Sequence, residues 1–151
     1  NKETLFSLAL ERYFRIQRAE LVATVQAAPT PLQGLAAYLR KFPERPEDDP
    51  QRGSCMLTKT LLGATAEDAH LAELAGQYID GMIAEMEAAF AQSQQRGALP
   101  ASAQVDHLAR RYQADLTALG VEASRGVGRA ALRLSAEELA QRVEALERVA
   151  E

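Results

Sequence analysis

The sequence predicts an all-α fold, and three observations support that prediction. Apolar residues recur every three or four positions along most of the chain, as they do on one face of an α-helix. Proline, glycine and capping residues divide this pattern into segments of helical length. No segment shows the sustained alternation of apolar and polar residues, rich in β-branched side chains, that is typical of a strand.

The first expected helix runs from Glu3 to about Val25, and Pro29 ends the pattern. Its apolar stripe has 3.6-residue spacing and consists of Phe6, Leu10, Tyr13, Phe14, Leu21 and Val25. Thr30 followed by Pro31 supplies an N-cap and a proline at the first helical position, so a second helix is expected from there to Phe42. Residues 43–51 contain three prolines and four acidic residues, which favour an exposed loop.

A third helix is expected to start at Gly53 or Ser54, and its run of apolar side chains up to Leu62 predicts that it is buried. The fourth and longest helix should extend from about Asp68 to Gln95, with Gly97 as its C-terminal stop. Its inner stripe consists of Leu71, Leu74, Tyr78, Met82, Met86 and Ala89.

Two more helices complete the expected fold. The fifth opens at Ser102 and reaches about Arg125, and Gly126 and Gly128 follow it. The segment Ser135-Ala136-Glu137-Glu138 has the pattern of a capping box, which predicts the start of the last helix at that serine.

Composition limits the classes of function. With 151 residues, 47% hydrophobic and 25% charged, the chain fits one globular domain with a substantial core. A net charge of -4 argues against DNA binding by this domain alone, because affinity for DNA comes largely from clustered Lys and Arg. Cys55 is the only cysteine, which fits a reducing cytoplasm, and no apolar run approaches the length of a membrane span.

Two motifs resemble the TetR family of transcriptional regulators. The opening N-K-E-T-L-F at residues 1–6 resembles the point where these proteins leave their helix-turn-helix and enter the ligand-binding domain. The segment G-S-C-M-L-T-K-T at residues 53–60 resembles the family's G-C-L-L-x-N-T stretch. Lys59 stands where the family commonly has Asn, and Gly63 where an acidic residue often follows, so polar roles tied to those positions are not transferred.

The resemblance implies that residues 1–151 form the C-terminal ligand-binding and dimerisation domain of a repressor. Residues 1–27 would be the connecting helix from an N-terminal helix-turn-helix domain outside this chain, and that domain would bind operator DNA. A small-molecule effector would change the separation of the two recognition helices in a homodimer. No cofactor is implied. The alternative is a stand-alone helical module that binds a small molecule or a partner protein without DNA.

The resemblance also implies an effector pocket between the helices. The candidate ligand-binding residues are Tyr38, Phe42, Met56, Lys59, Tyr78, Met82, Glu85, Met86, Tyr112 and Asp115. Methionine adapts to several ligand shapes and tyrosine adds a polar group, so the expected effector is mostly apolar. The same residues at helical spacing equally fit a plain core.

Three of the polar residues leave alternatives open. The carboxylates of Glu85 and Asp115 lie near apolar stripes, where they need a cationic ligand, a basic side chain such as Lys59, Arg110 or Arg111, or water. Cys55 is either a small buried hydrophobe or a redox or electrophile sensor, and its apolar neighbours favour the first interpretation.

The last two helices are expected to pair with those of a second copy as a four-helix bundle, as the resemblance implies. The candidate interface residues are Leu108, Tyr112, Leu116, Leu119, Leu139, Val143 and Leu146. An enzyme is not expected, because His70 and His107 fall on different helices and no nucleophile stands in a recognisable setting. The pair Glu67 and His70 has di-iron spacing but lacks the second copy that such sites use, so no metal site is predicted.

Overall fold

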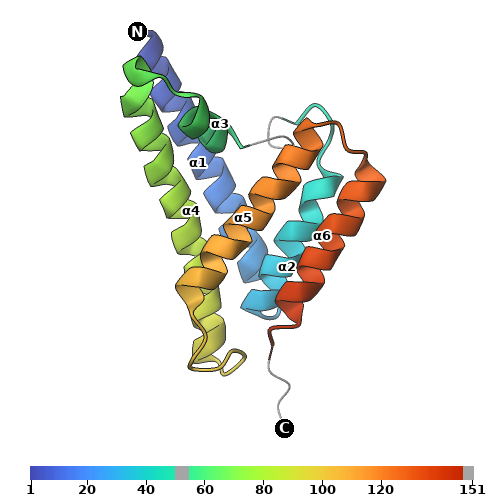
Figure 1. The fold of residues 1–151 in the computed structure, drawn as a ribbon. Coiled ribbons are helices and arrows are strands. Elements are labelled where there is room, and N and C mark those ends of the chain that lie inside the picture. Colours follow the sequence, from blue (N-terminus) through green and yellow to red (C-terminus); the bar gives the residue numbers. More distant parts are fainter. Residues whose placement is uncertain (50–54, 148–151) are drawn as a thin grey trace.

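The computed structural model describes residues 1–49 and 55–147, and every regular element in them is a helix (Figure 1). The α-helices are α1 (Lys2–Ala27), α2 (Pro31–Lys41), α3 (Met56–Gly63), α4 (Ala69–Gln95), α5 (Val105–Ser124) and α6 (Arg129–Glu144). Two short 3-10 helices, η1 (Phe42–Glu44) and η2 (Ala66–Asp68), precede and follow α3 in the sequence. The predicted all-α class is confirmed for these residues. Within them, no helix combines the length and the apolar character needed to cross a membrane.

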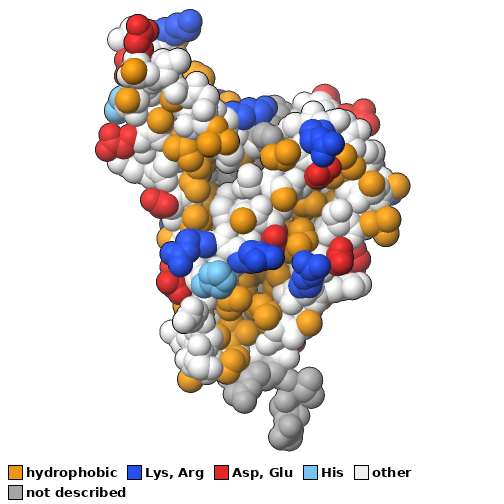
Figure 2. Space-filling model, viewed as in Figure 1, with side chains coloured by type: hydrophobic (Ala, Val, Ile, Leu, Met, Phe, Trp, Pro, Cys, Tyr) orange, Lys and Arg blue, Asp and Glu red, His pale blue; other side chains and the backbone are white. Residues whose placement is uncertain are grey.

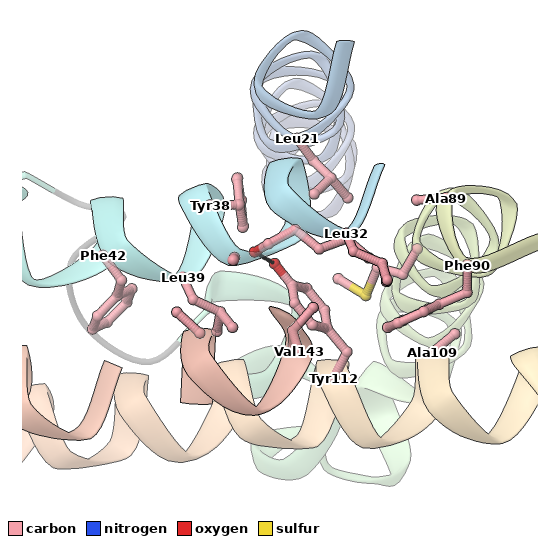
Figure 3. Packing of buried hydrophobic residues seen from close by; sticks show 14 of the residues in the cluster. Leu21, Leu32, Tyr38, Leu39, Phe42, Ala89, Phe90, Ala109, Tyr112 and Val143 are labelled. Atoms are coloured by element: carbon pink, nitrogen blue, oxygen red, sulfur yellow. Dashed lines mark hydrogen bonds between the residues drawn. The ribbon is translucent and has the colours of Figure 1, made fainter. Parts of the chain in front are cut away.

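The two longest helices, α1 and α4, lie side by side and run in the same direction (Figure 1). The short α3 packs against α4 near the start of this pair, while α5 packs against α4 further along. Helix α2 lies between α1 and α6 and packs most extensively against α6. The main hydrophobic core joins α1, α2, α4, α5 and α6 (Figure 3), and a smaller cluster around Leu10, Tyr13, Leu57 and Leu71 joins α1, α3 and α4.

Several predicted helix ends are confirmed. The hydroxyl of Thr30 accepts a hydrogen bond from the backbone N–H of Gln33 at 3.2 Å, and Pro31 is the first residue of α2. Gly97 has a φ of 80°, the left-handed conformation that ends α4. Helix α4 therefore stops at Gln95, as its sequence predicts.

The predicted start of the last helix is wrong. Helix α6 begins at Arg129, after Gly126 at a φ of 86° has turned the chain. Leu132 is only 1% exposed, and this burial favours helix in a turn that precedes Ser135. Glu138 pairs with Arg142 at 3.4 Å and does not cap a helix end. Tertiary packing therefore overrides the local capping signal.

The prediction that the third helix is buried is also wrong. Helix α3 has a single buried residue, Leu57, whereas Leu61 is 42% and Leu62 78% exposed. This eight-residue helix lies at the edge of the fold, where only one of its faces meets α4 and α1. The predicted starts at Gly53 or Ser54 lie outside the described residues.

Two other boundaries differ from the prediction. The expected loop from Pro43 begins with η1, in which Phe42 and Pro43 are buried, and only the residues that follow are largely exposed. Gln51, its predicted end, lies outside the described part of the chain. Helix α5 begins at Val105 and not at Ser102, after a turn in which Ala103 donates to the carbonyl of Pro100.

Arginine–glutamate pairs tie α6 to α2 and η1. Arg40 contacts Glu137 at 2.7 Å and Glu144 at 2.6 Å, so one guanidinium joins two turns of α6 to α2. Arg133 donates to Glu44 at 2.7 Å. Hydrogen bonds from these arginines lower the pKa of Glu44 and of Glu137. Both side chains therefore stabilise the folded state when they are charged.

These pairs predict a loss of stability in acid. Because the pKa of each carboxyl is lower in the folded state, its contribution is present above the usual value of 4.5 and is lost as the pH falls below it. We expect Glu44→Gln/Glu137→Gln to be less stable than the wild type at pH 7 and to differ from it much less at pH 3. Urea denaturation followed by circular dichroism at both pH values measures this. An equal difference at the two pH values would contradict the assigned role of these pairs.

Candidate functional site

A cavity of about 70 Å³ lies between the main core and the smaller cluster. Its walls come from α1, α2, η1, α4, α5 and the residues at the start of α3. The lining residues are Tyr13, Gln17, Tyr38, Phe42, Arg45, Cys55, Leu57, Ile79, Met82, Gln113, Leu116, Thr117 and Gly120. Most of this wall is apolar, with a few polar groups facing the space, which is the usual composition of a small-molecule site.

Two polar contacts involve residues that line the cavity. The hydroxyl of Tyr38 donates to Oε1 of Gln17 at 2.9 Å, and both residues are buried. Arg45, whose side chain is only 11% exposed, contacts Oε1 of Glu20 at 3.0 Å. Buried polar groups need such partners, because an unpaired one costs free energy. These contacts fix the positions of the polar groups on the cavity wall.

The two tyrosines of the cavity stay neutral at physiological pH. Burial is the main cause that raises the pKa of Tyr38; the charge of Glu20 raises it further, while Arg45 opposes both. Burial, followed by the neighbouring Cys55 thiol, raises the pKa of Tyr13. Each hydroxyl therefore offers hydrogen bonding and no charge. These groups can orient a ligand, and none of them is prepared to act as a base.

The size of the cavity limits what it accepts. A volume of about 70 Å³ exceeds the roughly 10–15 Å³ that one water requires, but it is small beside the roughly 300–1,000 Å³ of drug-sized pockets. It therefore fits a compact molecule, and a larger one would need movement of the walls. Met82 is the flexible side chain on the α4 side of this space.

The structure brings together only some of the predicted pocket residues. Tyr38, Phe42 and Met82 line the cavity. Met86 is fully buried in the main core, and so is Tyr112, whose hydroxyl donates to the carbonyl of Leu35 at 2.7 Å (Figure 3). These last two residues lie in the core and do not line the cavity.

Three more candidates lie away from the cavity in the folded chain. The ring of Tyr78 stacks on Phe14 with 4.7 Å between ring centroids, which joins α4 to α1. Met56 and Lys59 line a separate groove at the start of α1 and α3, beside Phe6.

Both candidate carboxylates have partners within the protein. Glu85 contacts Arg18 at 2.9 Å, a partner that was not among the expected ones. Asp115 lies 3.7 Å from Arg111, which was one of the expected basic partners. Neither carboxylate lines the cavity, so neither requires a cationic ligand there.

Several polar residues of the cavity were not predicted from the sequence, although a signal for one of them was present. Gln17 lies on the stripe of α1 between Tyr13 and Leu21, where a polar side chain interrupts an apolar face. Thr117 and Gln113 had no such signal, because they belong to the polar flank of α5. Cys55 was expected to be buried among apolar neighbours, but it is only half-buried and lines the cavity.

A second feature is a surface groove between α5 and α6. Its lining contains Leu108, Leu139 and Leu146, with Arg111 and Arg142 beside them. Figure 2 shows this face, where apolar side chains are exposed between the two helices below a row of basic ones. Leu146 is 37% exposed, whereas Leu108 and Leu139 are half-buried against the core.

The other predicted interface residues lie deeper in the same chain. Tyr112 and Val143 belong to the groove lining but are buried in the main core. Leu119 is only 2% exposed, and Leu116 lines the cavity. Of the seven predicted interface residues, only Leu108, Leu139 and Leu146 are therefore partly exposed in this groove.

Comparisons with family models, with curated proteins and with solved structures give no match for this chain. Within residues 1–49 and 55–147, no group of three or more His, Cys, Asp and Glu side chains is arranged to hold a metal ion.

Proposed function

We propose that this chain is the sensory domain of a TetR-like transcriptional regulator that binds a small, mostly apolar molecule. The observation that carries the proposal is the cavity, because α1 forms part of its wall through Tyr13 and Gln17. In the resembling family the corresponding helix connects the sensory domain to the DNA-binding domain. A ligand in this cavity would thus contact that helix directly. The proposed setting is the bacterial cytoplasm, and the proposed action is repression of transcription.

The proposed mechanism follows from the position of the cavity between α1 and its neighbours. Tyr13 and Gln17 of α1 line the same cavity as Ile79 and Met82 of α4. A molecule that occupies this space favours conformations in which the walls are further apart, which shifts the population of α1 orientations. In a dimer that reads two operator half-sites about one helical turn apart, a change in α1 would alter the fit to DNA.

The residues encoded upstream of Asn1 test the proposal directly. A basic segment of about fifty residues with helix-turn-helix patterning supports the regulator, because this acidic chain does not supply the positive charge that phosphate binding needs. A coding sequence without such a segment supports the alternative, a stand-alone helical module that binds a small molecule or a partner protein. A gel-shift assay of the 151-residue chain gives a second test: specific binding to duplex DNA would contradict the proposal.

Enlarging the cavity should change ligand affinity. For a compound selected by a thermal-shift screen against the wild type, we expect Met82→Ala to alter Kd at least several-fold, because Met82 lines the cavity. The loss of buried methylene groups should also lower stability by about 2–5 kcal/mol. Titration calorimetry and urea denaturation measure the two effects.

Met86→Ala is the matched control, since Met86 lies one turn further along α4, is fully buried and does not line the cavity. It should lower stability by a similar amount and leave Kd within about twofold of the wild type. Equal effects of the two substitutions on Kd would show that the compound does not occupy this cavity.

We further propose that the α5–α6 groove is the core of a homodimer interface, as in a four-helix bundle. Leu146→Glu should shift the chain towards monomers, because it places a charge beside the apolar residues of the groove. Sedimentation velocity at micromolar concentration measures the shift. Leu134→Glu is the control: Leu134 is 77% exposed, and it lies outside the groove. A wild-type chain that sediments as a monomer would contradict this proposal.

A further inference from the structure

The side-chain NH2 group of Gln17, a residue of the cavity wall, has no hydrogen-bond acceptor within the described residues. The residue is 8% exposed, and its Oε1 accepts the hydrogen bond from Tyr38. Within the described residues, no group accepts a hydrogen bond from its Nε2. The N–H groups of Gln17 are therefore available to donate to a suitable acceptor in the cavity that this residue lines.

The neighbouring contacts determine which end of the amide is available. The hydroxyl of Tyr38 points its proton at Oε1 of Gln17, at 2.9 Å. An amide oxygen only accepts, so this bond is made to the carbonyl end of Gln17. The carbonyl of Gln17 is therefore occupied, and its two N–H groups remain as donors.

The charge around the cavity argues against an ionic ligand. Among the described lining residues, Arg45 alone has a charged side chain, and Glu20 contacts it at 3.0 Å. An anion would have to compete with Glu20 for Arg45, while a cation would meet no carboxylate on the wall. Desolvation of either ion in a mostly apolar cavity would oppose binding.

We infer that the ligand is a compact, neutral, mostly apolar molecule with one carbonyl-type acceptor, such as a ketone, ester or lactone, bound by Nε2 of Gln17. This inference rests on the proposed function, because it assumes that the cavity is the sensory site. It makes Gln17 the residue that determines ligand specificity. The cavity volume of about 70 Å³ restricts the apolar part to a small ring or short chain unless the walls move.

Three ring compounds that differ in their polar group test the inference. Cyclohexanone, cyclohexanecarboxylate and cyclohexylammonium are titrated at pH 7 into the 15N-labelled chain of 151 residues, and binding is followed by NMR. The side-chain NH2 signals of Gln17 are assigned by their loss in Gln17→Met. We expect cyclohexanone to shift these signals and to bind at least about tenfold more tightly than either ion.

Substitutions at Gln17 provide a second test of the inference. Gln17→Glu replaces the donor with an acceptor, and Gln17→Met removes the donor without adding charge, so each should weaken cyclohexanone binding about tenfold. The second variant keeps the test valid if a buried carboxylate prevents folding, and circular dichroism checks both. Gln26→Glu, an exposed site on the same helix, should leave binding within about twofold.

The outcomes distinguish the inference about Gln17 from the proposal that the cavity is a ligand site. Tightest binding by cyclohexanecarboxylate or cyclohexylammonium, or cyclohexanone binding unchanged in the Gln17 variants, would overturn the inference and leave a ligand-binding cavity in place. Failure of all three compounds to bind would contradict the cavity as a ligand site and the proposed function with it.

Discussion

Gly34→Ala is expected to lower the free energy of unfolding by about 3 kcal/mol or more, because α1 and α2 cross in close contact at this glycine. A Cβ at Gly34 would lie 2.5 Å from the Cα of Val25 and 3.0 Å from its carbonyl oxygen. These atoms belong to the backbone of α1, so no side chain can rotate away to make room. The two helices would have to separate, and both take part in the main core. Urea denaturation of the variant and the wild type measures the loss.

Gly76→Ala is the matched control in the interior of another helix. A Cβ there would lie 4.0 Å from a side-chain carbon of Leu61, which is an ordinary contact distance. Alanine is favoured over glycine inside a helix by about 0.5–1 kcal/mol, so this variant should be slightly more stable than the wild type. Equal stability of the Gly34→Ala and Gly76→Ala variants would contradict the close crossing of α1 and α2.

Val143→Glu should unfold the protomer itself. Val143 is 9% exposed and belongs to the main core, so the substitution would force a carboxylate among apolar side chains, at about 3–5 kcal/mol. Thermal unfolding followed by circular dichroism measures this, and Leu134→Glu on the exposed face of the same helix should change stability by no more than about 0.5 kcal/mol. A folded Val143→Glu variant that is merely monomeric would show that Val143 contacts a second copy more than its own core.

The sequence predicts helices well where a backbone signal and an apolar stripe agree. At Thr30–Pro31 and at Gly97, the residue type imposes a backbone conformation, and the structure has the helix ends there. At Ser135 the local signal for a helix start is present, but the burial of Leu132 extends the helix upstream of it. Such packing joins residues distant in the sequence, so periodicity along one segment does not reveal it.

The candidate site was less predictable than the fold, for a similar reason. An apolar stripe shows which residues turn inwards, but it does not show which of them meet another side chain and which meet a cavity. Met82 and Met86 occupy equivalent places on α4, yet only Met82 lines the cavity. Tyr78 also turns inwards, but its ring stacks on Phe14 of α1. These differences depend on how far the neighbouring helices approach α4.

The position of the cavity along α1 has a mechanical consequence. Gln17 lies fifteen residues from Lys2, which at about 1.5 Å per residue places the start of the first turn of α1 about 22 Å along the helix from Gln17. A tilt of about 5° pivoting at Gln17 would displace that turn by about 2 Å, since a rigid rod magnifies rotation in proportion to its length. The first turns carry Leu5 and Leu8, which are 69% and 55% exposed. An angular change too small to disturb the core around Gln17 would thus become a displacement of about 1.6 Å at Leu5 and about 1.2 Å at Leu8.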